Sequence, residues 1–208
     1  MGRKGKTKNW ARKQDRDLYV RKARSSGARA RSAFKLEEID KRYKLIRPGM
    51  HVVDLGAAPG SWSQYVVSRL SGNGSLAAVD LLPMQAVEGA SFVQGDFTDI
   101  DIQERLIDSA EGRKFDLVLS DMAPNITGIR VTDQARAAVL QECIVNFCDN
   151  SLVPGGNLLT KVFEGENMTS VRKEFNERFE SVQTIKPDAS RSQSKEVYLL
   201  ARNFRSGS

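Results

Sequence analysis

The sequence predicts an α/β fold organised around an open, mostly parallel sheet. The stretch from His51 to Trp62, HVVDLGAAPGSW, has the pattern of a buried strand, a tight loop with two glycines and the start of a helix. Strand-like and helix-like segments alternate through the rest of the chain, and two strand-like segments follow each other at its end. The alternation predicts parallel crossovers, and the closing pair predicts an antiparallel edge.

A first helix is expected before the glycine loop. Ser32 is a residue type that favours the N-cap, and Leu36, Ile39 and Tyr43 follow at helical spacing. Pro48-Gly49 then marks the end of this helical segment. Lys35 lies in its first turn, beside the apolar stripe, and by itself would be a solvated lysine.

The middle of the chain continues the alternation. A helix is expected from Ser63 to Leu70, ended by Gly72-Asn73-Gly74. Phe115–Asp121 has a continuous apolar centre, which is typical of a parallel strand covered on both faces. Between these two segments, the pattern predicts the strands Ser75–Asp80 and Ser91–Gln94 and a helix near Asp101–Ala110.

The last part of the chain begins with a long helix from Thr132 to Asp149, and Pro154-Gly155-Gly156 is expected to stop it. The remaining segments are a strand at Asn157–Phe163, a helix at Met168–Phe179 and two strands at Ser181–Ile185 and Glu196–Ala201. No internal repeat is present in the sequence. One α/β domain over 32–203 accounts for these elements, with a short tail at 204–208.

The glycine loop limits which ligand can bind there. Gly56 and Gly60 allow positive φ or close approach of a ligand to the backbone. A dinucleotide fingerprint needs a third glycine in the spacing G-x-G-x-x-G, so a pyrophosphate is poorly accommodated. Taken alone, the glycine pair is equally well explained as a structural strand-to-helix turn.

Composition excludes several classes of protein. The chain has 208 residues, 40% of them hydrophobic, and contains no apolar run long enough to span a bilayer and no signal peptide. We expect a soluble cytoplasmic monomer. Cys143 and Cys148 fall on different faces of one helix, so neither a disulfide nor a metal pair is expected. His51 is the only histidine, which argues against Ser-His, Cys-His and zinc mechanisms.

The basic charge is concentrated in the first 31 residues. This leader contains twelve lysines and arginines and two aspartates, net +10, whereas the other 177 residues carry twenty basic and twenty-four acidic side chains, net −4. Trp10 and Tyr19 add stacking surfaces among these cations, which favours RNA or DNA as the partner. An anionic membrane surface is the weaker alternative, because no amphipathic stripe accompanies the charge.

Four predicted strands end in, or lead directly into, an aspartate: Asp54, Asp80, Asp96 and Asp121. The carboxyl ends of parallel strands meet at one edge of a sheet, so these carboxylates should gather around a single crevice. They would favour a cation, either a metal or an organic sulfonium or ammonium group. Asp80 also has the position from which an acid accepts hydrogen bonds from ribose hydroxyls. Each aspartate singly could be a turn residue, but four together indicate a site.

Several segments together resemble the FtsJ-like ribosomal RNA large-subunit 2′-O-ribose methyltransferases of bacteria. The segments that carry the resemblance are GARARSAFKLEEI, HVVDLGAAPGSWSQYV, DLLPM, FVQGDF, SDMAPN, GGNLLTKVFEGE and KPDASRSQSKEVYLLA. They extend from about Tyr19 to Ala201. The resemblance implies a Rossmann-like methyltransferase with a seven-stranded sheet, S-adenosylmethionine as donor, and a uridine in the A-loop of 23S rRNA as acceptor. Ser61 is a departure, because the family usually has a second glycine there.

The resemblance also implies a site. The family's catalytic Lys-Asp-Lys-Glu tetrad falls on Lys35, Asp121, Lys161 and Glu196. We expect Lys161 to accept or steer the proton of the ribose hydroxyl, with Lys35 as a second cation and the two acids orienting the amines. Cofactor contacts fall on Gly60 and Trp62 for the methionine part, Asp80 for the ribose, Asp96 for the adenine end, and Asp121 between cofactor and acceptor. Asp54 is expected mainly to hold the glycine loop.

Other functions stay open at this point. The same chemistry could act on tRNA or an mRNA cap, and a basic leader would also suit a non-catalytic RNA-binding ribosome-assembly factor. A nicotinamide oxidoreductase would use a similar sheet, but the missing third glycine and the acidic crevice disfavour it. The residues do not distinguish naked rRNA from the assembled subunit, nor do they fix the protonation state of Lys161. RNA contacts are expected from the leader and from Arg191 and Lys195.

Overall fold

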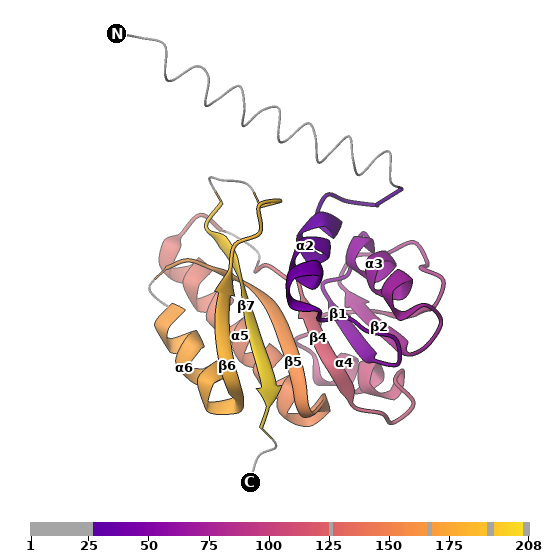
Figure 1. The fold of residues 1–208 in the computed structure, drawn as a ribbon. Helices are drawn as coiled ribbons and strands as arrows, with labels where there is room; N and C mark the ends of the chain where they lie inside the picture. Colours follow the sequence, from indigo (N-terminus) through magenta and orange to yellow (C-terminus); the bar gives the residue numbers. More distant parts are fainter. Residues whose placement is uncertain (1–26, 125–126, 166–167, 191–193, 206–208) are drawn as a thin grey trace.

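The protein folds around one seven-stranded sheet with helices on both faces (Figure 1). The structure is a computed structural model and describes residues 27–124, 127–165, 168–190 and 194–205. The leader residues Trp10 and Tyr19, and also Arg191, lie outside the described residues. The division of the chain into leader, domain and tail therefore stays a prediction.

All the predicted helices and strands are present, with boundaries shifted by a few residues. The helices are α2 (Ala33–Tyr43), α3 (Ser61–Leu70), α4 (Ile100–Asp108), α5 (Arg130–Ser151) and α6 (Met168–Arg178). The strands are β1 (His51–Leu55), β2 (Ser75–Asp80), β3 (Ala90–Gln94), β4 (Phe115–Ser120), β5 (Leu152–Phe163), β6 (Phe179–Ile185) and β7 (Glu196–Phe204).

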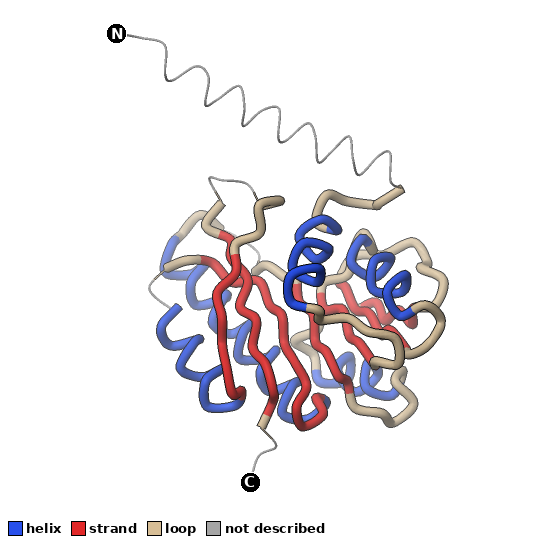
Figure 2. Tube along the Cα trace, viewed as in Figure 1, coloured by secondary structure: helices blue, strands red, loops and turns tan. Residues whose placement is uncertain are grey.

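The strand order is β3-β2-β1-β4-β5-β7-β6. Figure 2 shows the strands in red as the layer between the helices in blue. Strands β1 to β5 run parallel, and β7 pairs antiparallel with both β5 and β6. This confirms the mostly parallel sheet with an antiparallel last pair. Because β7 inserts between β5 and β6, its first residues lie directly beside the carboxyl end of β5. The strand order thus brings Glu196 next to Phe163 and Tyr198 next to Lys161.

Two local expectations were wrong. Pro154-Gly155-Gly156 does not stop α5, which ends earlier at Ser151. The pairing of β4 with β5 jumps from Phe115↔Leu152 to Leu117↔Asn157, so the turn residues form a bulge within β5. Ser32 does precede α2, but its backbone is already helical and its side chain makes no capping bond. Its hydroxyl instead pairs with the Ser61 hydroxyl at 2.7 Å.

The alternating apolar residues of the central strands divide between two core layers. Val53 and Val118 pack toward α4, α5 and α6, whereas Val52, Leu117 and Leu119 pack toward α2 and α3. Among the described residues, no helix combines the length and apolarity needed to cross a bilayer. Burial on both faces explains the continuous apolar pattern that predicted parallel strands.

Candidate active site

The glycine loop depends on its two glycines for both its backbone conformation and its packing. Gly56 and Gly60 have φ of +80° and +97°, a region that side-chain-bearing residues rarely adopt. A methyl group on Gly56 would lie 2.6 Å from Met122 Cγ, and one on Gly60 would lie 2.6 Å from Arg29 Nη1. The backbone N–H groups of Gly56 and Ala57 bond the Val79 carbonyl. The loop therefore lies across the carboxyl end of β2, just before α3 begins.

Asp80 is the carboxylate that holds this loop. One of its oxygens accepts a 2.9 Å hydrogen bond from the Ala58 N–H and the other accepts a 2.8 Å bond from the Leu82 N–H. Each carboxylate oxygen can accept a further bond, so Asp80 can support the loop and still receive a ligand hydroxyl.

Asp54 has a different role from the one expected. It is fully buried within β1 and accepts a 2.7 Å bond from the Ser63 hydroxyl of α3, so it ties strand to helix and does not hold the loop. Burial, together with the charges of Asp121 and Asp80, raises its pKa to about 7. Its second oxygen has no hydrogen-bond partner among the described residues. Only three of the four aspartates can therefore present a carboxylate to the crevice.

Asp96 follows β3 and is partly exposed. One of its carboxylate oxygens accepts bonds from both the N–H and the hydroxyl of Thr98, at 2.9 and 2.7 Å. These contacts fix the turn after β3 and leave the second oxygen available for a ligand. Its contact with the adenine end of a cofactor stays a prediction.

Trp62 points away from the crevice. Its indole is 2% exposed and donates a 2.9 Å bond to the Ser32 carbonyl, while its ring lies 5.8 Å from the Tyr198 ring. The side chain thus braces α2 against the site, and any contact of Trp62 with a cofactor must come from its backbone. The Ser61 side chain is likewise buried and turned toward Ser32. Serine in place of the usual glycine therefore does not fill the crevice.

The tetrad residues come together as two ion pairs. Lys161 on β5 lies 3.1 Å from Asp121 Oδ1 and also donates to the Asp121 carbonyl. Lys35 on α2 pairs with Glu196 at the start of β7. All four side chains are less than one-fifth exposed. Burial of this kind strengthens each charge pair relative to one in water.

Tyr198 joins the two pairs, and the sequence interpretation missed it. Its hydroxyl donates a 2.7 Å bond to Asp121 Oδ1 and accepts a 3.4 Å bond from Lys35 Nζ. Burial and the charges of Asp121 and Glu196 raise the pKa of the phenol, so it remains a donor. Strand periodicity could have identified it, because Tyr198 lies two residues after Glu196 and so shares its face.

Arg29 is a second residue outside the predicted set. Its guanidinium donates to the carbonyls of Pro59, Gln85 and Ala86 at 3.1, 2.6 and 2.7 Å. It therefore fastens the glycine loop to the segment that follows β2. No motif in the sequence indicated this contact, because three backbone carbonyls carry no residue-specific pattern.

The site contains acids but no metal-binding cluster. Within the described ranges, no group of three or more histidines, cysteines and acids has a geometry that could hold a metal ion.

Comparisons with known proteins agree with this geometry. A family model described as FtsJ-like methyltransferase matches residues 28–204. A relative from Alkalilimnicola ehrlichii is 47% identical over 98% of this chain and 99% of its own, and one from Azoarcus sp. BH72 is 48% identical over 99% and 100%. Both are named ribosomal RNA large subunit methyltransferase E.

Solved structures share the same architecture. A crystal structure described as a ribosomal RNA methyltransferase of Plasmodium falciparum has a TM-score of 0.77 and 25% identity, over 86% of this chain and all of its own. A fibrillarin from Methanococcus jannaschii, at 12% identity and a TM-score of 0.55 over 77% of this chain and 69% of its own, shares the fold alone. With the family model and the near-full-length relatives, these findings show that the chain belongs to the FtsJ-like methyltransferase family.

Proposed function

We propose that this protein transfers the methyl group of S-adenosylmethionine to the ribose 2′-hydroxyl of a uridine in the A-loop of 23S rRNA, in the assembled large ribosomal subunit. The observation that carries the proposal is the linked array in which Lys161, Asp121, Tyr198, Lys35 and Glu196 meet at the carboxyl edge of the sheet. The names of the near-full-length relatives support the choice of rRNA. The site of action would be the cytoplasm.

The crevice suits the proposed donor. Side chains at Gly56 and Gly60 would collide with Met122 and Arg29, so the loop can pack in this conformation only with glycine at both positions. Gly60 and the Trp62 backbone would hold the methionine part, Asp80 the ribose, and Asp96 the adenine end. Asp121 would lie between donor and acceptor. S-adenosylmethionine supplies a methyl group on a sulfonium. The three aspartates other than the buried Asp54, namely Asp80, Asp96 and Asp121, would stabilise its positive charge.

Lys161 would act on the acceptor hydroxyl. A ribose 2′-hydroxyl is a weak nucleophile, so the enzyme must aim its oxygen and accept or steer its proton as the new O–C bond forms. The bond between the methyl group and the sulfonium would break in the same step, and the donor would leave as the neutral thioether S-adenosylhomocysteine. Asp121 fixes the Lys161 amine, and the Lys35–Glu196 pair holds Tyr198 against Asp121 from the other side. General-base help supplies about 10²- to 10⁴-fold and positioning about 7–11 kcal/mol, so alignment is the larger contribution.

The proposal is tested by methyl transfer from labelled S-adenosylmethionine to under-methylated large ribosomal subunits, followed by mapping of the labelled nucleotide. Naked 23S rRNA, tRNA and capped RNA serve as parallel substrates. We expect label on one A-loop uridine of the subunit, blocked at its 2′-oxygen. Label on tRNA or cap alone would contradict the choice of substrate, and binding of subunits without any transfer would indicate an assembly factor.

A further inference from the structure

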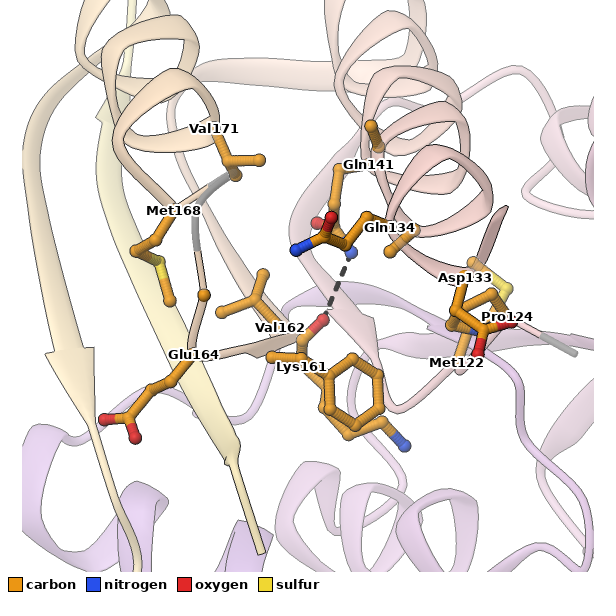
Figure 3. Close-up of a pocket in the computed structure, with 14 residues that line it drawn as sticks. Met122, Pro124, Asp133, Gln134, Gln141, Lys161, Val162, Glu164, Met168 and Val171 are labelled. Atoms are coloured by element: carbon orange, nitrogen blue, oxygen red, sulfur yellow. Dashed lines mark hydrogen bonds between the residues drawn. The ribbon is translucent and has the colours of Figure 1, made fainter. Parts of the chain in front are cut away.

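A hollow of about 250 Å³ adjoins the tetrad residue Lys161, which is one of the residues that line it (Figure 3). The ends of β4 and β5 form one wall, and α5 with the start of α6 forms the other. Met122 separates the hollow from the glycine loop, because it lines the hollow and would also contact a side chain at Gly56. Of the four tetrad residues, Lys161 alone lines the hollow.

Its wall is mostly apolar, and two of its polar side chains, Gln141 and Asp133, are already paired. Gln141 donates to the Lys161 carbonyl at 3.1 Å and accepts from the Thr160 hydroxyl at 3.2 Å. The Asp133 carboxylate accepts from Thr127 and Gly128. The hollow therefore offers shape and apolar contact, which suit a flat, uncharged ring better than a charged group.

Phe163, the last residue of β5, supplies an aromatic side chain to the lining of the hollow. It is 36% exposed, so its ring is accessible to a ligand. It lies two residues beyond Lys161 on β5 and is the register partner of Glu196 on β7, so all three side chains share the face of the sheet that packs toward α2 and α3. The hollow lies on the face toward α5 and α6, and Phe163, as the last residue of β5, borders both. An exposed aromatic ring in this position is a stacking surface next to the proton-accepting amine.

We propose that this hollow, with Phe163 as its stacking surface, receives the nucleobase of the nucleotide whose ribose is methylated. The inference rests on the proposed function. In-line displacement requires the acceptor oxygen opposite the sulfonium, so the acceptor nucleotide must reach Lys161, and the hollow is a cavity that Lys161 lines. A base unstacked from its neighbours and placed against an aromatic ring is the usual way in which proteins hold a nucleotide for chemistry on it.

The test is a substitution series at Phe163 in the full-length enzyme, assayed on under-methylated large subunits. Stacking predicts that Phe163→Trp keeps near wild-type kcat/KM, that Phe163→Leu is intermediate, and that Phe163→Ala loses roughly 10- to 100-fold. Ala138→Phe, which fills the hollow, should abolish transfer. S-adenosylmethionine affinity by calorimetry should stay unchanged throughout. Val139→Ala is the matched control, because Val139 is an exposed neighbour of Ala138 that does not line the hollow.

The outcomes separate the two proposals. If the wild-type enzyme methylates the subunits and Phe163→Ala equals Val139→Ala, the hollow does not hold the base and the proposed function stands. Equal losses in all three Phe163 variants would also overturn the stacking role. If the wild-type enzyme transfers no methyl group to any rRNA ribose, the proposed function itself fails. If Ala138→Phe does not fold, the Phe163 substitutions still test whether the hollow holds the base, because Phe163 is exposed and its replacement leaves the core intact.

Discussion

The hydroxyl of Tyr198 donates a 2.7 Å hydrogen bond to Asp121, the same carboxylate oxygen that pairs with Lys161. Tyr198 and Lys161 are also direct register partners on β7 and β5. One carboxylate oxygen therefore sets the positions of a lysine and a phenol from neighbouring antiparallel strands. The Lys35–Glu196 pair then closes the array from α2.

Removing the Lys161 amine should stop methyl transfer. Because this amine alone is fixed against Asp121 at the crevice, we expect Lys161→Ala to lower the single-turnover rate by at least about 10²-fold while S-adenosylmethionine binding stays near normal. Lys114→Ala, at an exposed lysine before β4, is the control. A Lys161→Ala variant that kept the wild-type single-turnover rate would overturn the assignment.

Removing only the Tyr198 hydroxyl should misalign the tetrad side chains but leave all four of them in place. A hydrogen bond to a charged group contributes about 1.5–3 kcal/mol, so Tyr198→Phe should lower kcat by roughly 10-fold with little change in KM. The pH dependence of kcat should shift as well, since Asp121 then acts on Lys161 alone. A loss of thermal stability with an unchanged pH profile would show that Tyr198 is merely structural.

Replacing the Asp80 carboxylate should weaken the binding of S-adenosylmethionine. Asp80→Ala removes the proposed ribose contact and also releases the Ala58 N–H that orders the glycine loop. We expect S-adenosylmethionine affinity in calorimetry to fall by about 10-fold or more. Asp96→Ala, at the outer end of the crevice, should have a smaller effect. Unchanged affinity in Asp80→Ala would argue against the ribose contact.

Asp54 should make the protein less stable as the pH rises. Its pKa is about 7 in the folded state, against an ordinary value of 3.8 for an exposed aspartate, so the folded state binds the additional proton between these values. Its contribution to stability is fully present below pH 3.8 and is lost as the pH rises toward 7, by up to about 1.4 kcal/mol per pH unit.

Asp54→Asn should remove this pH dependence while keeping an acceptor for the Ser63 hydroxyl. Urea unfolding at pH 5 and pH 8 measures it, with the variant gaining stability relative to wild type at the higher pH. Equal pH slopes for wild type and variant would show that Asp54 does not titrate in this range.

Removing the basic leader should change how RNA binding responds to salt. Truncation of residues 1–25 takes away ten of the twelve leader cations, so affinity for the subunit should fall and the salt slope should become flatter. Binding assays across a salt series measure both. A truncated protein with the full-length slope would show that the leader takes no part in RNA binding.

Most of the fold could be predicted from the sequence because it depends on local pattern. Period-2 and period-3.6 apolar spacing identified every helix and strand that the structure describes, and the closing strand pair predicted the antiparallel edge. Aspartates at the strand ends located the crevice at the carboxyl edge of the sheet. The tetrad came from the family resemblance, since a lysine such as Lys35 has no local pattern that distinguishes it from a solvated one.

Only the tertiary structure decided which partner each polar side chain takes. The insertion of β7 beside β5 brings Tyr198 to Lys161 and Phe163 to Glu196 across a long stretch of chain. Asp54 is buried within β1, so it contacts Ser63 of α3 and does not support the glycine loop as expected. Folding also brings Arg29 to three backbone carbonyls that are distant in the sequence. Periodicity fixes which face a side chain occupies, but its neighbours on that face depend on strand order, which no local pattern encodes.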